Sequence, residues 1–416
     1  MNPAGQDGTW DRPLWRSLLP IGRDERTGGY RRFSFTPEGQ ACRDWFLVAA
    51  AERGLFAEAD QNGNLWAWWR PAAATDAEAG AIVTGSHLDS VPDGGGFDGP
   101  LGVASAFLAI DVLAERGLAP VRPIGVVAFA EEEGARFGTA CLGSRLLTGA
   151  VTPDAALALA DEEGVGLGDA MAAAGLSPQA IGADPLRVGR IALFVELHIE
   201  QGSALAGLGA AVGVGSSIWP HGRWRIDFTG RADHAGTTRL ADRRDPMLAY
   251  AATVLEARVA AAELAALATF GKVVAIPGAS NAIASAVHAW LDARAPDGGR
   301  LSALVDRVIG AAEQAAMEQG VQVSHRRESF SPLVEFDAAL RGQVVAALRT
   351  MGLTAPELGT GAGHDAGVLA AAVPSAMLFV RNRTGVSHSP AEHAEPADCE
   401  AGVAALAAVL EEFACR

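Results

Sequence analysis

Histidine, aspartate and glutamate residues stand directly after short apolar runs at several separate points of this chain of 416 residues. The run 81–84 precedes His87, and Asp98 follows in a glycine-rich loop. The run 124–130 ends at Glu131–Glu133. Short apolar runs bounded by turn signals are typical of buried strands, and parallel strands bring their carboxyl ends to one edge of a sheet. The pattern therefore predicts a fold in which several buried strands deliver polar side chains to a common edge.

Two further apolar runs follow the same rule. Residues 192–197 end at His198, and residues 375–380 precede a loop that contains His388. A helical pattern over 100–117 begins with proline and ends at glycine, the expected residues at those positions. Strand, helix and strand in this order form a right-handed parallel unit. We therefore expect an α/β fold with a mixed, mostly parallel sheet and helices on both faces.

The middle of the chain shows another pattern. Residues 224–228 alternate between apolar and polar, and residues 285–291 do so more weakly, as half-buried antiparallel strands do. Helical patterns cover 245–267 and 300–319. Together these segments predict a smaller α+β domain with an antiparallel sheet, inserted into the first domain.

The length of the chain also favours two domains, because a single core of this size is uncommon. We place the boundaries so that residues 1–209 and 327–416 form the metal-binding domain and residues 210–326 form the inserted lid or dimerisation domain.

Charge and composition narrow the possible partners. The chain has 49 acidic and 33 basic residues and a net charge of −16, so it should repel nucleic acid. No signal pattern occurs between Met1 and Arg16, and no apolar stretch of about 20 residues is present. These features favour a cytoplasmic protein that does not bind a membrane. The cysteines are scattered without a CxxC pair, which predicts idle thiols at Cys42, Cys141, Cys399 and Cys415.

The first two clusters suit a metal ion. Glycines between His87 and Asp98 let the backbone turn tightly, so that both side chains can reach one ion. The carboxylate of Asp89 suits an indirect role, accepting the second imidazole N–H and fixing the ring tautomer. Glu132 and Glu133 offer a metal ligand and a general base side by side, two roles that need different carboxylates. The residues alone do not decide which glutamate has which role.

The remaining histidines complete a set for two ions. His198 follows an apolar run, and His388 lies in a loop shaped by glycine and proline, with His393 as the rival ligand. Two metal ions that share a carboxylate need a bridging Asp or Glu and further His, Asp or Glu ligands on rigid supports. The separated clusters together meet this need and predict a hydrolytic reaction.

These residues closely resemble the amidase, hydantoinase and carbamoylase branch of the dinuclear, M20-like metallopeptidase superfamily. That branch includes N-carbamoyl-L-amino acid amidohydrolase, allantoate amidohydrolase and β-ureidopropionase. The resemblance is carried by the metal clusters and by residues 28–33 (GGYRRF), 198–202 (HIEQG) and 361–366 (GAGHDA). It implies two divalent ions (Zn, Mn, Co or Ni), a cis peptide after the bridging aspartate, and Glu132 as acid/base. The implied ligand sets are His87, Asp98 and His198 for one ion, and Asp98, Glu133 and His388 for the other.

The resemblance also implies substrate contacts. His234 resembles a histidine that stabilises the oxyanion from the partner subunit of a homodimer. Asn281 and Arg294 resemble a pair that binds the substrate carboxylate, and a guanidinium fork and an amide suit that task. Gln201 and His364 resemble residues that contact the ureido group and the intermediate.

The expected activity is hydrolysis of the ureido (carbamoyl) C–N bond of a small carboxylate such as an N-carbamoyl-L-amino acid, releasing ammonia and carbon dioxide. One alternative is an allantoate or ureidoglycolate amidohydrolase, and another is a dipeptidase or aminoacylase that uses the same metals. A non-catalytic binding scaffold is the alternative from a different class. The complete set of ligand positions and Glu132 argue against the scaffold.

Overall fold

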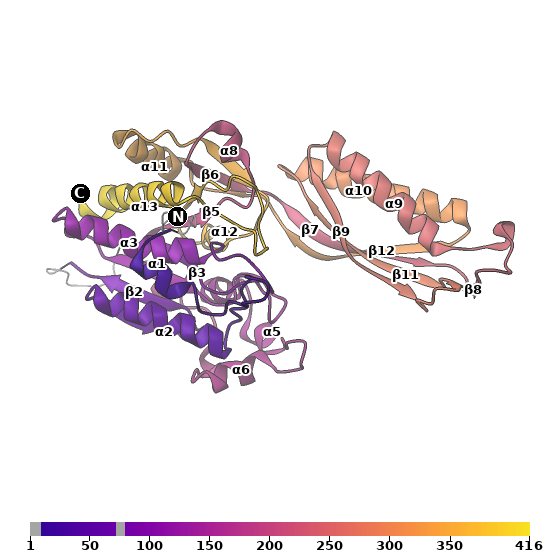
Figure 1. Cartoon of the computed structure of the whole chain (residues 1–416), viewed down its shortest axis with the longest axis horizontal. Coiled ribbons are helices and arrows are strands. Elements are labelled where there is room, and N and C mark those ends of the chain that lie inside the picture. Colours follow the sequence, from indigo (N-terminus) through magenta and orange to yellow (C-terminus); the bar gives the residue numbers. More distant parts are fainter. Residues whose placement is uncertain (1–9, 72–79) are drawn as a thin grey trace, which may run out of the picture. The chain divides into compact units, whose positions relative to one another are not determined.

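The computed structural model describes residues 10–71 and 80–416. Residues 1–9, part of the stretch without a predicted signal, lie outside the described residues. The chain divides into two compact units, which are described separately: unit 1 is Met1–Ser216 with Glu335–Arg416, and unit 2 is Ser217–Val334. Figure 1 shows the elements of both in sequence colours.

Unit 1 contains a mixed sheet in the order β1-β2-β4-β3-β5-β15-β6-β13, with β14 paired to β6. The central strands β4, β3, β5 and β15 are parallel neighbours, whereas β1–β2, β2–β4 and β15–β6 are antiparallel. The predicted α/β class is confirmed. The strands are β1 (Phe56–Ala59), β2 (Leu65–Trp69), β3 (Ala81–His87), β4 (Ile124–Phe129), β5 (Ile191–Ile199), β6 (Val212–Ile218), β13 (Val334–Glu335), β14 (Glu357–Thr360) and β15 (Ser375–Val380).

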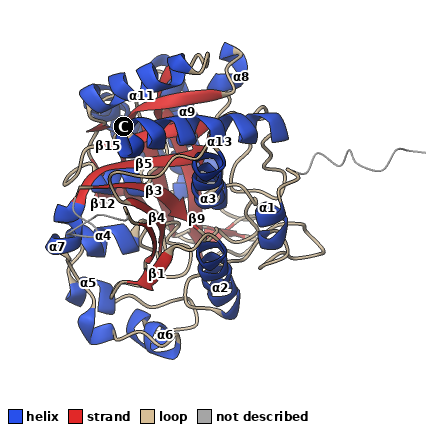
Figure 2. Ribbon diagram, turned by 90° about the vertical axis from the view of Figure 1, so that its left-hand side faces the viewer, coloured by secondary structure: helices blue, strands red, loops and turns tan. Residues whose placement is uncertain are grey.

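Helices cover both faces of this sheet (Figure 2). One layer shares the main core of unit 1 and consists of α1 (Pro13–Leu18), α2 (Pro37–Glu52), α3 (Pro100–Glu115), α11 (Ala338–Thr350) and α13 (Pro396–Leu410). The other side carries short helices, among them α4 (Leu142–Thr148), α5 (Pro153–Leu157), α6 (Leu167–Ala173) and α7 (Pro185–Arg190). Because both faces are covered, every residue of β3, β4 and β15 is buried, as their apolar sequences require.

Unit 2 contains a four-stranded antiparallel sheet in the order β12-β7-β11-β9. The strands are β7 (His221–Thr229), β9 (Leu267–Ile276), β11 (Ala286–Arg294) and β12 (Gln322–Ser331), with a short ribbon of β8 (Asp233–His234) and β10 (Ala282–Ile283). Helices α9 (Pro246–Glu263) and α10 (Gly298–Gln319) pack on this sheet. Burial alternates along β11, so that Val287 and Leu291 enter the core while His288 and Trp290 lie on the other face.

The remaining elements are short. They are α8 (Ala204–Leu208), α12 (Asp365–Leu369), the 3-10 turns Pro178–Ala180 and Leu240–Asp242, and the π-helical turn Glu411–Cys415. None of the described helices combines the length and apolar composition needed to cross a bilayer.

Two local expectations differ from the structure. His198 lies inside β5 instead of after it, because β15 continues the pairing through Phe379 opposite His198. The expected cis peptide after Asp98 is wrong: among the described residues only Ile276–Pro277 is cis. The chain turns after Asp98 at Gly99, whose φ is 84° and where an added Cβ would lie 2.3 Å from the His87 ring.

Candidate metal centre

The first ligand set is held by two neighbouring strands. His87 ends β3, His198 lies in β5, and both face Asp98 in the loop before α3. The His198 Nε2 atom is 3.1 Å from Asp98 Oδ1, and the His87 Nε2 atom is 3.6 Å from the same oxygen. Ligand atoms of a tetrahedral ion with bonds of about 2.0 Å would lie about 3.3 Å apart. All three side chains are buried, so the geometry suits a metal ion.

The ring tautomers of these histidines follow from their partners. The His87 Nδ1 atom is 3.1 Å from the Asp89 carbonyl, and the His198 Nδ1 atom is 2.8 Å from the Ile199 carbonyl. A carbonyl only accepts, so each Nδ1 carries hydrogen, and Nε2 is the atom that each ring can offer to a metal ion. Within the described part of the chain, both buried Nε2 atoms lack a hydrogen-bond partner. A metal ion is the partner that such nitrogens fit.

The role of Asp89 differs from the prediction. Its main-chain carbonyl accepts the His87 hydrogen, while its carboxylate accepts from the backbone N–H of Glu132 at 3.2 Å and of Glu133 at 3.0 Å. The Asp89 Oδ1 atom lies 3.6 Å from His87 Nδ1, which is too long for a hydrogen bond, while the turn after β4 holds the carboxylate. Asp89 thereby positions the two glutamates as well as His87.

The second ligand set is completed by loops. The His388 Nε2 atom lies 3.5 Å from both Asp98 Oδ2 and Glu133 Oε2. His388 lies in the loop after β15 and has a φ of 54°, a backbone conformation that residues other than glycine seldom adopt. The rival His393 packs against the Phe97 ring instead. The structure thus brings Asp98, Glu133 and His388 together, with Asp98 common to both sets.

The three consecutive glutamates point in different directions. Glu131 turns back and accepts from the N–H groups of Arg136 and Phe137, each at 2.9 Å. Glu132 places Oε2 3.6 Å from His87 Nε2, and its Oε1 accepts from the Cys141 thiol at 3.2 Å. Glu133 therefore lies with Asp98 and His388, and Glu132 lies beside His87 as a separate carboxylate.

Buried carboxyl groups dominate this site. Burial raises the pKa of Glu132 well above its ordinary value, with His87 opposing and Asp365 adding to the shift. Burial and the nearby Asp98 raise the pKa of Glu133 to about 8. Burial would also raise the pKa of Asp98, but His198 and His87 outweigh it and hold that pKa well below the ordinary range. Bound cations would compensate the charge of carboxylates buried this close together. The carboxylate and imidazole groups present are suitable ligands for such cations.

Gln201 and His364 border the same centre. The Gln201 amide donates to Asp98 Oδ2 at 2.6 Å and lies 3.4 Å from His388 Nε2. The His364 ring stacks edge-on against His198, with centroids 4.5 Å apart. Burial, and then the charge of His198, lower the pKa of His364 well below its ordinary value, so this ring is neutral.

His234 and Asn281 lie together in unit 2. His234 pairs with Ala282 in the β8–β10 ribbon, and the Asn281 carbonyl accepts from the Ala235 N–H at 3.0 Å. The His234 Nδ1 atom accepts from the Gly236 N–H at 3.0 Å. In the neutral ring Nε2 therefore carries the hydrogen and can donate to an anion. The side chain is exposed.

The structure does not bring Asn281 and Arg294 together. On β11, Ala286 pairs with Thr229 at the end next to the β8–β10 ribbon, while Arg294 pairs with His221 at the opposite end. Eight strand steps separate these ends by about 26 Å. Within one subunit, therefore, the Asn281 and Arg294 side chains cannot meet on one carboxylate, and their pairing stays a prediction. Arg294 instead forks onto Asp292, with N···O distances of 2.7 and 3.1 Å.

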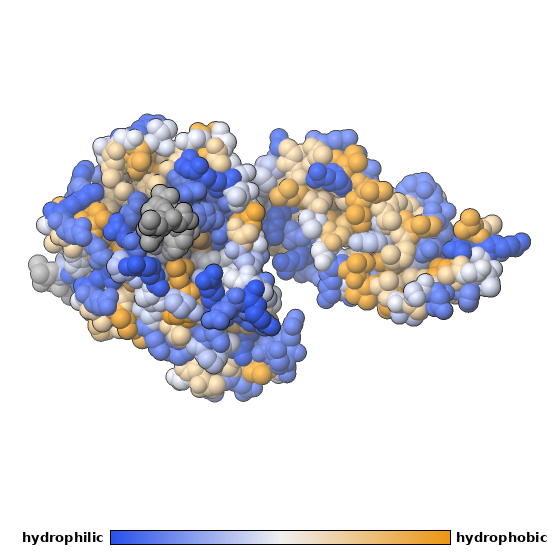
Figure 3. Space-filling model, viewed as in Figure 1, coloured by the Kyte–Doolittle hydropathy of each residue, from blue (hydrophilic) through white to orange (hydrophobic). Residues whose placement is uncertain are grey.

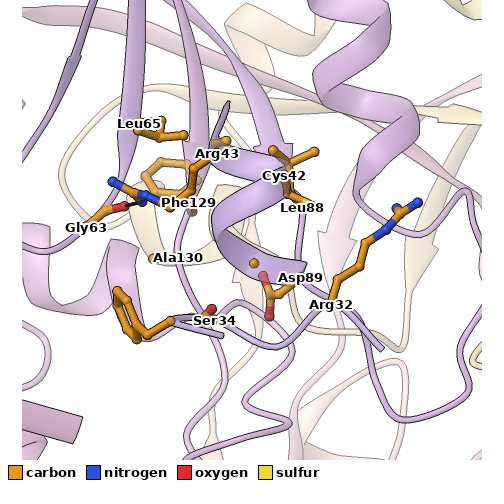
Figure 4. Close-up of a pocket in the computed structure, with 13 residues that line it drawn as sticks. Arg32, Ser34, Cys42, Arg43, Gly63, Leu65, Leu88, Asp89, Phe129 and Ala130 are labelled. Carbon is orange, nitrogen blue, oxygen red and sulfur yellow. Dashed lines mark hydrogen bonds between the residues drawn. The ribbon is translucent and has the colours of Figure 1, made fainter. Parts of the chain in front are cut away.

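Asp89 is one of the residues that line a small cavity of about 40 Å³ (Figure 4). Ser34, Leu88 and Phe129 are among its lining residues, and the Arg32 guanidinium points away from Asp89. Ligand pockets usually have volumes of about 300–1,000 Å³, so this cavity is too small for a substrate.

Sequence reasoning missed Glu392. Its Oε1 atom accepts from the N–H groups of Phe97 and Asp98, each at 2.9 Å, and its Oε2 atom lies 3.2 Å from the Ser387 hydroxyl. The available signal was a carboxylate four residues after the loop histidine, in the segment SHSPAE.

Comparisons with known proteins show what this chain is similar to. The profile of "Peptidase family M20/M25/M40" matches residues 83–412. The N-carbamoyl-L-amino acid amidohydrolase of Geobacillus stearothermophilus is 36% identical, with 94% of this chain and 96% of that protein covered. The allantoate amidohydrolase of Escherichia coli K12 is 31% identical over 95% and 96% of the two chains. A hydantoinase/carbamoylase family amidase from Burkholderia ambifaria has a similar structure, with a TM-score of 0.83, 34% identity and 96% of each chain covered.

Proposed function

Starting from a chain that belongs to peptidase family M20/M25/M40, we propose that it hydrolyses the ureido (carbamoyl) C–N bond of a small carboxylate such as an N-carbamoyl-L-amino acid. The products are ammonia, carbon dioxide and the free amine. The observation that carries this proposal is the pair of ligand sets that share Asp98, with Glu132 beside them. The names of the two relatives support the substrate class.

The ligand sets would hold two divalent cations. His87, Asp98 and His198 form one set, and Asp98, Glu133 and His388 form the other. Zn, Mn, Co and Ni all suit nitrogen and carboxylate ligands of this kind. When bound, such cations polarise a carbonyl oxygen and lower the pKa of water.

Glu132 is the proposed acid/base. Its Oε2 atom lies on the His87 side of the centre, and Oε1 is held by the Cys141 thiol. Glu132 takes a proton from the attacking water and returns it to the leaving nitrogen, which balances the transfer over the reaction. Burial excludes competing solvent from this carboxylate.

His234 and Arg294 are the proposed substrate contacts in unit 2. The Nε2–H group of His234 would donate to the oxyanion that forms at the ureido carbon. The Arg294 guanidinium would bind the substrate carboxylate. Because Arg294 and the His234–Asn281 ribbon lie at opposite ends of one sheet, we assign them to different subunits of a homodimer, with His234 and Asn281 supplied by the partner.

The surface of unit 2 supports a homodimer. Strand β9 is an edge strand with exposed Val273, Val274 and Ile276, and α9 packs on it. Leu248, Leu255 and Val259 form an exposed apolar stripe along α9. Figure 3 shows hydrophobic surface over the helices of this unit. An exposed edge strand that pairs with its own copy gives a closed two-fold interface and removes an aggregation-prone edge.

A substrate panel tests the proposal. Purified protein is loaded with Zn, Mn, Co or Ni in turn and assayed for ammonia release from carbamoyl-amino acids, allantoate and ureidoglycolate, and for cleavage of acyl-amino acids and dipeptides. We expect the highest kcat/KM on a carbamoyl-amino acid. Preference for allantoate, the substrate in the name of the Escherichia coli relative, would support an allantoate amidohydrolase instead. Preference for dipeptides or acyl-amino acids, or no turnover with any metal, would overturn the proposal.

A further inference from the structure

The second ligand set depends on two loops that are remote in sequence. Asp98 lies in the loop before α3, and His388 lies in the loop after β15. Ser387, next to His388, is 289 positions from Asp98. Neither residue belongs to a strand, in contrast to His87 and His198. Contacts between the two loops must therefore maintain their spacing.

Glu392 supplies these contacts. One carboxylate oxygen accepts from two successive backbone N–H groups, those of Phe97 and Asp98, at 2.9 Å each. The other oxygen lies 3.2 Å from the hydroxyl of Ser387 in the histidine loop. The side chain is buried, so water does not compete strongly for these bonds. One carboxylate thus joins both loops.

The glycine-rich loop fits closely around this carboxylate. A Cβ atom added at Gly95 would lie 2.4 Å from both the Cβ and Oε1 atoms of Glu392. Gly95 therefore leaves the space that the glutamate occupies. The two loops are therefore closely packed at Gly95 and Glu392.

The contacts of Ser387 and Glu392 involve the side of Asp98 that belongs to the second ligand set. Asp98 Oδ1 faces His87 and His198, whereas Oδ2 faces His388 and accepts from the Ser387 hydroxyl at 3.0 Å. Ser387 has one hydroxyl hydrogen, which can serve either Asp98 or Glu392 at a given moment. In the described part of the chain, Glu392 makes no hydrogen bond to the strand-held His87 and His198. Loss of Glu392 should therefore disturb the side of Asp98 that faces His388.

We propose that Glu392 is a positioning residue that holds the Asp98 and His388 loops together and so controls metal binding at the second ligand set. This inference rests on the two-metal centre of the proposed function. It assigns to Glu392 no contact with substrate. Outer partners of metal ligands typically change metal affinity about 10–100-fold when they are replaced.

Metal binding measures this role directly. The full-length protein is stripped of metal, loaded with Zn²⁺, dialysed against a zinc buffer and analysed for zinc per subunit by mass spectrometry and for affinity by calorimetry. We expect two ions in the wild type. In Glu392→Ala the second ion should bind about 10–100-fold more weakly while the first is retained. Glu392→Gln should recover most of the affinity, because the amide oxygen can still accept from both N–H groups.

Glu395→Ala is the matched control. It removes a glutamate three residues away whose side chain is 40% exposed, and it should keep both ions. Two ions with unchanged affinities in Glu392→Ala, or equal loss of both ions, would overturn the proposal. Should Glu392→Ala not fold, Ser387→Ala tests the same link between the two loops. Selectively weaker binding of the second ion supports the proposal, and unchanged affinities refute it.

The outcome is separable from the proposed reaction. A wild type that binds two zinc ions but hydrolyses no ureido compound would overturn the proposed function and leave the metal measurements valid as a test of Glu392. A wild type that binds fewer than two ions would overturn both.

Discussion

The two units treat their sheets in opposite ways. In unit 1 the central strands are covered on both faces, and every residue of β3 is buried. In unit 2 burial alternates along β11, so one face of the sheet carries His288, Trp290 and Arg294, none of them in the core. Groups in unit 1 are held in a dry, rigid setting that strengthens electrostatic effects, while those in unit 2 remain partly hydrated. We therefore expect unit 1 to supply the chemistry and unit 2 to supply recognition.

Glu132→Gln should give the largest effect. The amide cannot take a proton, so kcat should fall by about 10²–10⁴ or more while KM and metal content stay close to those of the wild type. Steady-state kinetics and metal analysis measure this. Glu131→Gln, which changes a neighbouring glutamate that points away from the centre, is the control for the loss of charge. Near wild-type kcat in Glu132→Gln would remove the assigned acid/base.

Arg294→Ala should affect recognition instead. Loss of a charged hydrogen bond to the substrate carboxylate costs about 1.5–3 kcal/mol, so KM should rise about 10–100-fold with a smaller change in kcat. The exposed Arg239→Ala, in the same unit, should leave KM unchanged. If kcat falls and KM does not, Arg294 does not bind the carboxylate and the division between the units is wrong.

Subunit mixing sharpens the same comparison. His234→Ala and Asp98→Ala proteins should each be inactive, because one lacks the oxyanion donor and the other the bridging ligand. If His234 acts across the dimer, exchange of subunits should restore about a quarter of wild-type activity, since half the dimers are mixed and each has one intact site. Ammonia release is assayed before and after exchange, which is verified by mass spectrometry of tagged subunits. No recovery after demonstrated exchange would place His234 in its own subunit's site.

The smallest expected effect is a pH dependence of stability in unit 2. Burial by itself would raise the pKa of Asp292. The hydrogen bonds and charge of Arg294 outweigh burial and lower this pKa below its ordinary value. A carboxyl with a lowered folded pKa stabilises the fold above its ordinary value of about 3.9, and this contribution is lost as the pH falls through the folded pKa. The urea midpoint, measured from about pH 6 to about pH 3, should fall less with decreasing pH in Asp292→Asn than in the wild type. Equal slopes would exclude this contribution.

Local pattern was sufficient for much of unit 1. The apolar run 375–380 coincides with β15, and the proline at residue 100 begins α3 as predicted. The prediction that polar residues follow the buried strands is correct for His87 at the end of β3 and for the glutamates after β4. These features depend on periodicity and on turn residues, which neighbouring positions determine.

Other features depended on contacts between distant segments. The separation of Asn281 from Arg294 follows from strand register, which residue spacing alone does not reveal. The different positions of the Glu132 and Glu133 side chains depend on contacts of the turn after β4 with Asp89 and Cys141. Glu392 could be assigned a partner only when two loops met.

The amino-acid sequence by itself determined the α/β class, the pattern of buried strands and the kinds of ligand available, because side-chain polarity and backbone preference act over short distances. The tertiary structure decided that Glu132 lies beside His87 and Glu133 beside His388, which end of the unit 2 sheet carries Arg294, and how Glu392 joins two loops. Those outcomes depend on hydrogen bonds and strand register between segments that come together only when the chain folds.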